Sequence, residues 1–254
     1  MNNARLAQAG HCPSEYGRIG PHAFSEHLRG QRFISSGHVK EHVQHVGKAG
    51  VSNVPGLHDL HRMTAQLLAE AAPDVADILV VGAGGGMEIA AMGGTRPNWR
   101  FVGVDPSAEM LTLACQTTKL INERVELIEG IVDDVPVKTF DGATCLFVLH
   151  HVESSEQLRI LRSIRRRLRP GSRFVFSEHA AIGVNPEVWL ARSVSFSQGG
   201  GIESSEAAAR AAMMHHRLSL HTPNETEAML RDAGFCDPDI FYAAFSLRGW
   251  VATA

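Results

Sequence analysis

From residue 57 onward, apolar segments of strand length alternate with patterns of helical spacing. Leu57, Leu60, Met63 and Leu67 recur at helical intervals and stop before Pro73, which predicts an amphipathic helix over 57–72. The following segments predict strands at 77–82, 100–104, 124–129, 142–148 and 172–178, and helices at 86–93, 107–119 and 154–168. Strands that alternate with helices favour a mostly parallel sheet with helices on both faces.

Three further parts of the chain lie outside this alternation. Residues 183–221 contain Trp189, a glycine break at 199–201 and a helical run over 204–218, which favours a substrate-covering insertion. A helix at 222–233, closed by Gly234, and strands at about 238–242 and 245–252 follow the insertion. Residues 1–56 are rich in Gly, His and Ser with one candidate helix at 37–46. We therefore expect a lid over 1–56 and one domain over 57–254.

The most informative residues follow the first strand. Three alternate glycines, Gly82, Gly84 and Gly86, come there, and the next strand ends in Asp105, 23 positions after Gly82. Glycine lets the backbone turn sharply and approach a ligand closely. An acid roughly 20 residues farther on can accept hydrogen bonds from ribose hydroxyls, so the pattern predicts a nucleoside-binding half-domain. Met87 stands where the dinucleotide fingerprint G-x-G-x-x-G/A needs a small residue, and the loop reads G-x-G-x-G instead.

Composition and charge narrow the class of protein. The 254 residues are 44% hydrophobic and 20% charged, which is ordinary for a globular chain with a sizeable core. The net charge of −3 gives no basic excess, so we expect no nucleic-acid or membrane partner. The four cysteines form no C-x-x-C pair, and the chain has neither an apolar run of about 18 residues nor a signal-peptide pattern at its start. We expect a cytoplasmic location.

Between residues 77 and 178 the sequence resembles the class I S-adenosylmethionine (SAM)-dependent methyltransferases, motif by motif and in order. The similar segments are the family's glycine loop, acidic strand end, adenine-contacting segment, fourth strand with its catalytic-face loop, and fifth strand, at 80–86, 102–111, 129–136, 140–151 and 168–178. The resemblance implies a Rossmann-like α/β fold with a mostly parallel seven-stranded sheet, helices on both faces, an N-terminal helical lid and a helical insertion after the fifth strand. It also implies SAM as the cofactor and S-adenosylhomocysteine (SAH) as its product.

The family's motifs imply cofactor contacts along the ends of four strands. The residues that match them are Gly82, Ala83, Gly84, Gly86, Asp105, Pro106, Met110, Ile131, Val132, Asp133 and Leu149.

Two positions depart from the family's pattern. Val80 stands where many methyltransferases have an acid, two residues before the first glycine, and Ile131 stands where many have Asp. The resemblance then implies that backbone groups of Ile131 and Val132 hold the adenine, with Asp133 or Asp134 nearby. The glycine loop would hold the amino-acid moiety of SAM with help from Glu88.

The flanking segments are similar to a narrower group. Residues 54–57, 177–178 and 227–235, with the terminal strands, resemble the subgroup that contains the bacterial carboxy-SAM synthase of tRNA wobble-uridine modification. That synthase family uses an arginine in the insertion to hold the extra carboxylate of its product, and Arg210 lies in the insertion here. The similarity leaves open whether SAM is a cofactor or a substrate of this chain.

Histidines supply the candidate catalytic groups. His150 and His151 follow the fourth strand, His179 follows the fifth, and His215 lies in the insertion. A neutral imidazole can accept a proton from a hydroxyl or amine acceptor. For each of them a structural role, in a loop or on a helix surface, is the alternative. Because the histidines lack metal-ligand spacing, we expect no metal.

The segment after the fourth strand also bears on the acceptor. It reads Leu149-His150-His151-Val152 rather than the Asn/Asp-Pro-Pro-aromatic tetrad of DNA or protein amide N-methyltransferases. We therefore expect methyl transfer from SAM to an oxygen, nitrogen or carbon of a small biosynthetic molecule. The alternatives are a carboxy-SAM-synthase-like enzyme, a non-catalytic SAM-binding protein and, last, an NAD-dependent oxidoreductase. An insertion rich in Ala, Met and Trp favours a homodimer.

Overall fold

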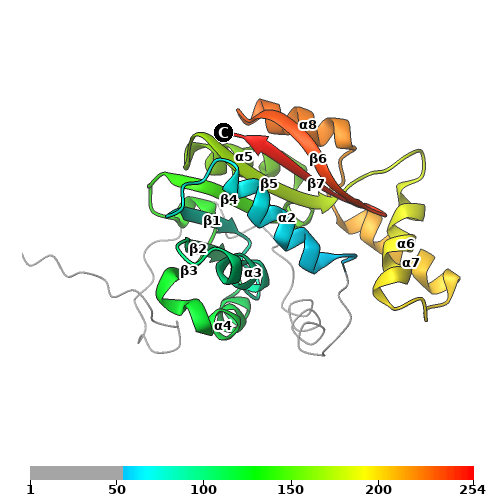
Figure 1. The fold of residues 1–254 in the computed structure, drawn as a ribbon. Helices are drawn as coiled ribbons and strands as arrows, with labels where there is room; N and C mark the ends of the chain where they lie inside the picture. Colours follow the sequence, from blue (N-terminus) through cyan, green and yellow to red (C-terminus); the bar gives the residue numbers. More distant parts are fainter. Residues whose placement is uncertain (1–53) are drawn as a thin grey trace, which may run out of the picture.

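The computed structural model describes residues 54–254, which are built around one seven-stranded sheet (Figure 1). The strand order is β3-β2-β1-β4-β5-β7-β6. Neighbours among β1 to β5 are parallel, whereas β7 is antiparallel to both β5 and β6. The strands are β1 (Asp77–Val81), β2 (Arg100–Asp105), β3 (Val125–Glu129), β4 (Phe140–Leu146), β5 (Leu168–His179), β6 (Cys236–Ala244) and β7 (Leu247–Thr253).

Helices cover both faces of the sheet. On one face, Leu68 of α2 and Ile89 of α3 are buried with Val80 of the sheet. On the other, Leu161 of α5 and Leu230 of α8 are buried in one cluster with strand residues that include Phe174 and Phe176. The helices are α2 (Leu57–Ala69), α3 (Met87–Thr95), α4 (Ala108–Thr117), α5 (Ser154–Arg166), α6 (Pro186–Ser197), α7 (Ser204–Arg217) and α8 (Pro223–Asp232).

The predicted fold class is confirmed: a mostly parallel seven-stranded sheet lies between helices. The start of β5 differs from the prediction for a physical reason. β5 begins at Leu168 rather than 172, because Leu168 pairs with Phe140 before a register shift that contains Pro170 and Gly171. The backbone N–H of Gly171 donates to the carbonyl of Ala254 at 2.6 Å, so this irregular part of the strand still has a partner.

The insertion after β5 contains two helices, α6 and α7, which lie together at one end of the molecule (Figure 1). The sequence pattern predicted only the second, because the apolar residues of α6 are not gathered on one stripe. Pro186 occupies the first turn of α6, where its missing N–H needs no partner. The expected lid falls on residues 1–53 and the first described residues after them, and the candidate helix at 37–46 lies outside the described part of the chain.

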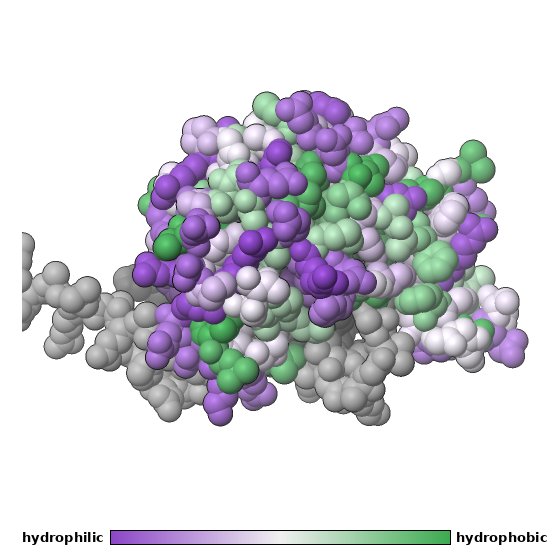
Figure 2. Space-filling view, viewed as in Figure 1, coloured by the Kyte–Doolittle hydropathy of each residue, from purple (hydrophilic) through white to green (hydrophobic). Residues whose placement is uncertain are grey.

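Hydrophilic and hydrophobic residues are mixed on the face shown in Figure 2, and the insertion at the right of the molecule includes apolar surface. Four of its large apolar side chains are exposed: Val184, Val188, Phe196 and Met213. Among residues 54–254, none of the helices combines the length and apolar character that a bilayer crossing requires.

Two carboxyl groups are buried in the sheet layer. Glu88 of α3 accepts a hydrogen bond from the hydroxyl of Thr144, and Glu178 of β5 accepts one from Thr226 at 2.8 Å. Burial raises the pKa of Glu88 to about 7 and that of Glu178 to about 8, although both hydrogen bonds act in the opposite direction. The fold therefore keeps two protons that an unfolded chain would release near pH 4.5.

The glycine loop gives a first stability prediction. Gly86 has φ +77°, and a Cβ there would lie 2.9 Å from Cα of Ala114. We expect Gly86→Ala to lower the free energy of unfolding by about 1–3 kcal/mol in denaturant titrations. Gly94→Ala on the same helix is the control: its Cβ meets no atom within 4 Å, so it should gain about 0.5–1 kcal/mol. Equal effects of the two changes would contradict this reading.

Stability should also depend on pH through the buried carboxyls. Above pH 6.5 the native state binds more protons than the unfolded state, because Glu88 and Glu178 titrate at about 7 and 8 when folded. The free energy of unfolding should therefore fall as pH rises from 6.5 to 8, by up to about 1.4 kcal/mol per pH unit for each carboxyl. Glu178→Gln should remove one of these two contributions. A slope unchanged in that variant would show that Glu178 ionises normally in the fold.

Candidate active site

The candidate site lies along the carboxyl edge of the parallel strands. Because β1 to β5 run in the same direction, the segments that follow them come together at this edge. In open α/β sheets, ligands bind outside these strand ends, where the strand order reverses. Here β1 is flanked by β2 on one side and β4 on the other, so the strand order reverses between β1 and β4. The structure therefore places the glycine loop at the switch point itself.

The glycine loop runs from β1 to the N-terminus of α3. Gly82, Gly84 and Gly86 have φ values of +73°, +49° and +77°, in the left-handed region that other residues avoid. A Cβ on Gly82 would overlap Cγ2 of Val148, so backbone and side chain are in close contact there. The N–H groups of Gly82 and Ala83 donate to the carbonyl of Val104 at 2.8 and 3.0 Å, which fixes the start of the turn.

Asp105 ties the end of β2 to this loop. Its Oδ2 accepts a hydrogen bond from the N–H of Gly84 at 2.9 Å, and its Oδ1 accepts one from the N–H of Ser107 at 2.9 Å. Burial raises the pKa of Asp105, and the two backbone hydrogen bonds oppose that shift. Each carboxylate oxygen keeps a second lone pair, so the group is fixed in place and still able to accept ribose hydroxyls.

Two predicted cofactor contacts flank this carboxylate. Pro106 is exposed directly after β2. Met110, in the first turn of α4, is 9% exposed, and its methyl carbon lies 3.6 Å from where a Cβ of Gly84 would be. Met110 therefore borders the glycine loop, and Pro106 directly follows Asp105; that they contact a cofactor stays a prediction.

The segment after β3 is held by its own side chains. The carboxylate of Asp134 accepts the N–H of Ile131 at 2.8 Å. The carboxylate of Asp133 is paired with Arg159 and Ser163 of α5, and these contacts lower its pKa against the effect of burial. Val132 is buried, at 2% exposure. Asp133 thus faces α5 with its charge already satisfied, which leaves the backbone and the half-buried Ile131 to meet a ligand.

Three of the four candidate histidines lie together, after β4 and at the end of β5. The ring centroid of His150 is 4.3 Å from that of His151 and 5.1 Å from that of His179. The backbone N–H of His179 donates to Nδ1 of the His150 ring at 3.2 Å, so one ring nitrogen of His150 already has a partner. His215 is exposed on the last turn of α7, outside this cluster. Leu149, next to His150, is fully buried.

Burial sets the protonation state of this cluster. Desolvation and the neighbouring histidines hold the pKa of His150 well below its usual value, and desolvation with His151 lowers that of His179 to about 4. Both rings are neutral at pH 7 but are weak bases, whereas an efficient general base has a pKa near the working pH. His150 and His179 are thus suited to orienting neighbours, and His151 is the exposed member of the cluster.

The histidine cluster is bonded to the insertion through two serines. Nδ1 of His179 lies 2.8 Å from the hydroxyl of Ser246, which lies 2.6 Å from the hydroxyl of Ser193 on α6. At the other end of the insertion, the N–H of Ser219 donates to the carbonyl of His150 at 2.9 Å. Helix α6 of the insertion is therefore linked to His179, and the end of the insertion is linked to His150. No sequence motif marks Ser193 or Ser246 as part of this network, because their contacts join segments that are distant in the sequence.

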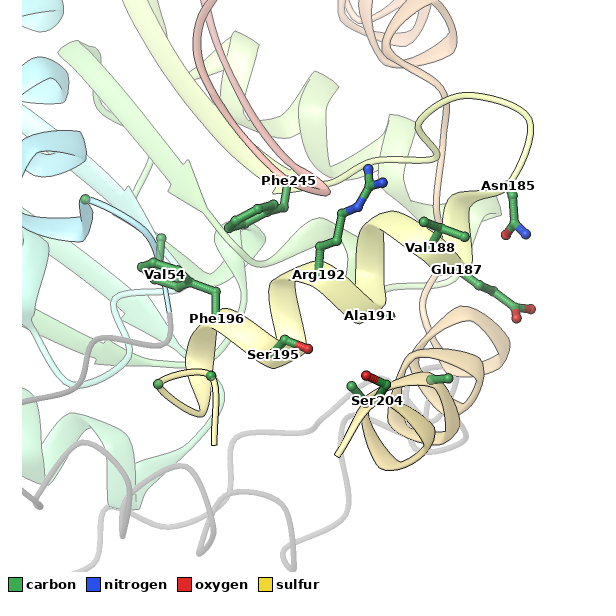
Figure 3. Close-up of a pocket in the computed structure, with 15 residues that line it drawn as sticks. Val54, Asn185, Glu187, Val188, Ala191, Arg192, Ser195, Phe196, Ser204 and Phe245 are labelled. Atoms are coloured by element: carbon green, nitrogen blue, oxygen red, sulfur yellow. The ribbon is translucent and has the colours of Figure 1, made fainter. Parts of the chain in front are cut away.

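A cavity of about 1030 Å³ opens between α6, α7 and the β6–β7 turn (Figure 3). Phe196 and Phe245 form one wall, with ring centroids 5.7 Å apart, and Val54 lies beside them. Arg192 also lines the cavity, with its guanidinium 4.4 Å from the ring centroid of Trp189. Among the described residues, no carboxylate forms an ion pair with Arg192. Phe245 precedes Ser246, so this wall is continuous with the histidine network.

Within residues 54–254, no three His, Cys, Asp or Glu side chains gather closely enough to hold a metal ion. The expectation of a metal-free site stays a prediction.

Comparisons with known proteins bear on this geometry. Residues 79–174 match a family model described as a methyltransferase domain. A carboxy-S-adenosyl-L-methionine synthase from Colwellia psychrerythraea is 23% identical over 206 residues, which cover 79% of this chain and 84% of the relative. The matched domain contains the glycine loop, Asp105 and the histidines after β4.

Two solved structures show the same fold. A candidate O-methyltransferase from Nostoc punctiforme has a TM-score of 0.59 at 19% identity, over 86% of this chain and 68% of that one. The 1,6-didemethyltoxoflavin-N1-methyltransferase of Burkholderia thailandensis, solved with SAH bound, has a TM-score of 0.53 at 22% identity, over 76% of this chain and 77% of that one. The chain thus has the fold of the class I, SAM-dependent methyltransferases, and its residues 79–174 match a methyltransferase-domain model.

Proposed function

We propose that this chain is a SAM-dependent methyltransferase whose acceptor is a small molecule. The observation that carries the proposal is the pairing of Asp105 with the N–H of Gly84, which holds a carboxylate beside the glycine turn. An adenosine bound at the switch point would place its ribose hydroxyls on this carboxylate. The methyltransferase-domain match over residues 79–174 supports the same assignment.

In this proposal the cofactor is held mainly by the backbone. Gly82, Ala83, Gly84 and Gly86 provide the turn, and the segment that begins at Ile131 provides a wall for the adenine. SAM supplies the electrophilic methyl group when bound. The protein's own contribution is to position the acceptor and to keep water away from it.

The acceptor is proposed to bind in the cavity under the insertion, next to the histidines. Two phenylalanines and several small side chains make its lining mostly apolar, which suits an aromatic or otherwise hydrophobic small molecule. His151 is exposed beside His150 and is the proposed proton acceptor for a hydroxyl or amine. The exposed apolar side chains of α6 and α7 support the additional proposal of a homodimer.

A carboxy-SAM-synthase-like activity is the second candidate, because the relative from Colwellia psychrerythraea described above is such a synthase. Arg210 was the arginine expected to hold the product's extra carboxylate. In the structure it is an exposed residue of α7, paired with Glu206 at 2.6 Å. Arg192 is the insertion arginine that lines the cavity. An enzyme of this second type would therefore depend on Arg192 rather than Arg210.

Calorimetric titration tests the cofactor assignment. We expect micromolar binding of SAM and SAH and none of NAD. Asp105→Asn should weaken SAM binding about 10- to 100-fold, because a charge-assisted hydrogen bond is worth about 1.5–3 kcal/mol. Glu126→Gln is the matched control, since Glu126 is an exposed carboxylate of β3 outside the expected cofactor contacts. Tight binding of NAD, or no loss in Asp105→Asn, would contradict the assignment.

A product assay tests the reaction and the acceptor cavity. SAH release would be measured with a panel of aromatic hydroxyl and amino compounds. Phe196→Ala should raise KM for an accepted compound about 10-fold or more, through lost apolar contact, without changing the Kd of SAM. Met213→Ala, an exposed change on α7 outside the cavity lining, should change neither. Formation of carboxy-SAM from SAM and prephenate would favour the second candidate, and binding without any product would favour a non-catalytic protein.

A further inference from the structure

Glu88 is a buried carboxyl next to the glycine loop that the proposed chemistry does not yet use. It is the second residue of α3, directly after Met87, and Gly86 of the loop is the N-cap of that helix. Its side chain is 7% exposed and accepts a hydrogen bond from the hydroxyl of Thr144 on β4. Among the described residues, no Lys, Arg or His forms an ion pair with it. This acid thus has a hydroxyl partner but no counter-charge.

The sheet register places this carboxyl near Val80, the position at which many methyltransferases have an acid. Val80 of β1 pairs with Thr144 of β4 in the parallel ladder, so the two side chains are neighbours on the same face. That face is the one covered by α3, since Val80 is buried in one cluster with Ile89 and Met92. Val80 is also the position where the resemblance led us to expect an acid. The carboxylate of Glu88, bonded to Thr144, therefore lies close to the position of Val80 but comes from α3 rather than from β1.

An uncompensated carboxyl in the protein interior needs an explanation. Burial without a counter-charge disfavours its ionised form, and the fold keeps the group although a Gln or Thr would satisfy Thr144 as well. A bound cation would supply the missing charge. SAM carries two positive groups, the ammonium of its amino-acid moiety and the sulfonium that bears the methyl group.

The chemistry of transfer favours the ammonium as the partner. The sulfonium charge disappears as the methyl group leaves, so a carboxylate fixed against it would stabilise the ground state more than the transition state and slow the reaction. The ammonium keeps its charge throughout, and an interaction with it binds cofactor and transition state equally. An anion at this position is also favoured by the N-terminal end of the α3 dipole.

We propose that Glu88 binds the ammonium group of the cofactor's amino-acid moiety, and that it supplies from α3 the carboxylate that β1 lacks at Val80. This inference rests on the proposed function. It makes Glu88 a cofactor-binding residue and explains how a loop without the usual acid still holds a cationic ligand. It also predicts selectivity for ligands that carry the amino group.

The test compares SAH with its des-amino analogue, 5′-S-(3-carboxypropyl)-5′-thioadenosine, by calorimetry. The wild-type chain should bind SAH at least 10-fold more tightly than the analogue. Glu88→Gln should bind the two ligands equally, at the level of the analogue on the wild type. Glu178→Gln, the other buried carboxyl, is the matched control and should keep the full difference. Thermal unfolding without ligand should show Glu88→Gln to be at least as stable as the wild type, since a buried charge is removed.

A second variant separates binding from packing. Val80→Asp in the Glu88→Gln background returns a carboxylate to the same place from the strand, and should restore the preference for SAH. If Glu88→Gln keeps the preference for SAH, or if the double variant folds and does not regain it, the inference is wrong while the proposed function stands. If the wild type binds neither SAH nor SAM, the proposed function fails and this inference fails with it.

Discussion

The hydrogen bond from the N–H of Gly84 to the carboxylate of Asp105 joins the two halves of the proposed cofactor site. It crosses from the loop after β1 to the end of β2 and so fixes the turn relative to the sheet. The bond joins a left-handed backbone at Gly84 to a half-buried acid at the strand end, and the glycine and the acid are both visible in the sequence. Without it, the three glycines would form only a turn, and the acid would have no fixed position beside it.

Several ionisable groups in and around the site are buried at a cost. Glu88, Glu178, His150 and His179 each have a pKa shifted by burial toward the neutral form. The two histidines also connect the end of the sheet to the insertion. His179 reaches the insertion through Ser246 and Ser193, and the carbonyl of His150 receives the N–H of Ser219. The insertion is therefore attached to the end of the sheet by polar contacts, and the cavity lies between its two helices and that attachment.

Much of the fold could be predicted from the sequence, because its signals are local. Apolar strands, amphipathic helices and the glycine turn are set by neighbouring residues. The seven strands and the helices other than α6 were predicted close to their observed positions. Helix α6 was missed because its apolar residues are spread around the helix, although its buried residues, Leu190, Ser193 and Val194, lie on one face. The start of β5 was missed because a shifted register, and not a hydrophobic pattern, includes Pro170 and Gly171.

The site was predictable to a smaller extent. The glycine loop and Asp105 could be found because their spacing is itself the signal. Sequence alone could not show that His150 and His179 are neutral, or that His150 is buried while His151 is exposed, because burial depends on which segments pack together. The same holds for Asp133, whose carboxylate faces Arg159 of α5 from 26 residues away. Phe245 and Arg192 carry no motif and enter the cavity only through the fold.

A crystal structure of the chain with SAH would test the central claim most directly. The account predicts the ribose hydroxyls within hydrogen-bond distance of the Asp105 carboxylate, with the homocysteine moiety over the glycine loop. It would be contradicted by SAH bound away from this edge of the sheet, or by a ribose whose hydroxyls make no contact with Asp105.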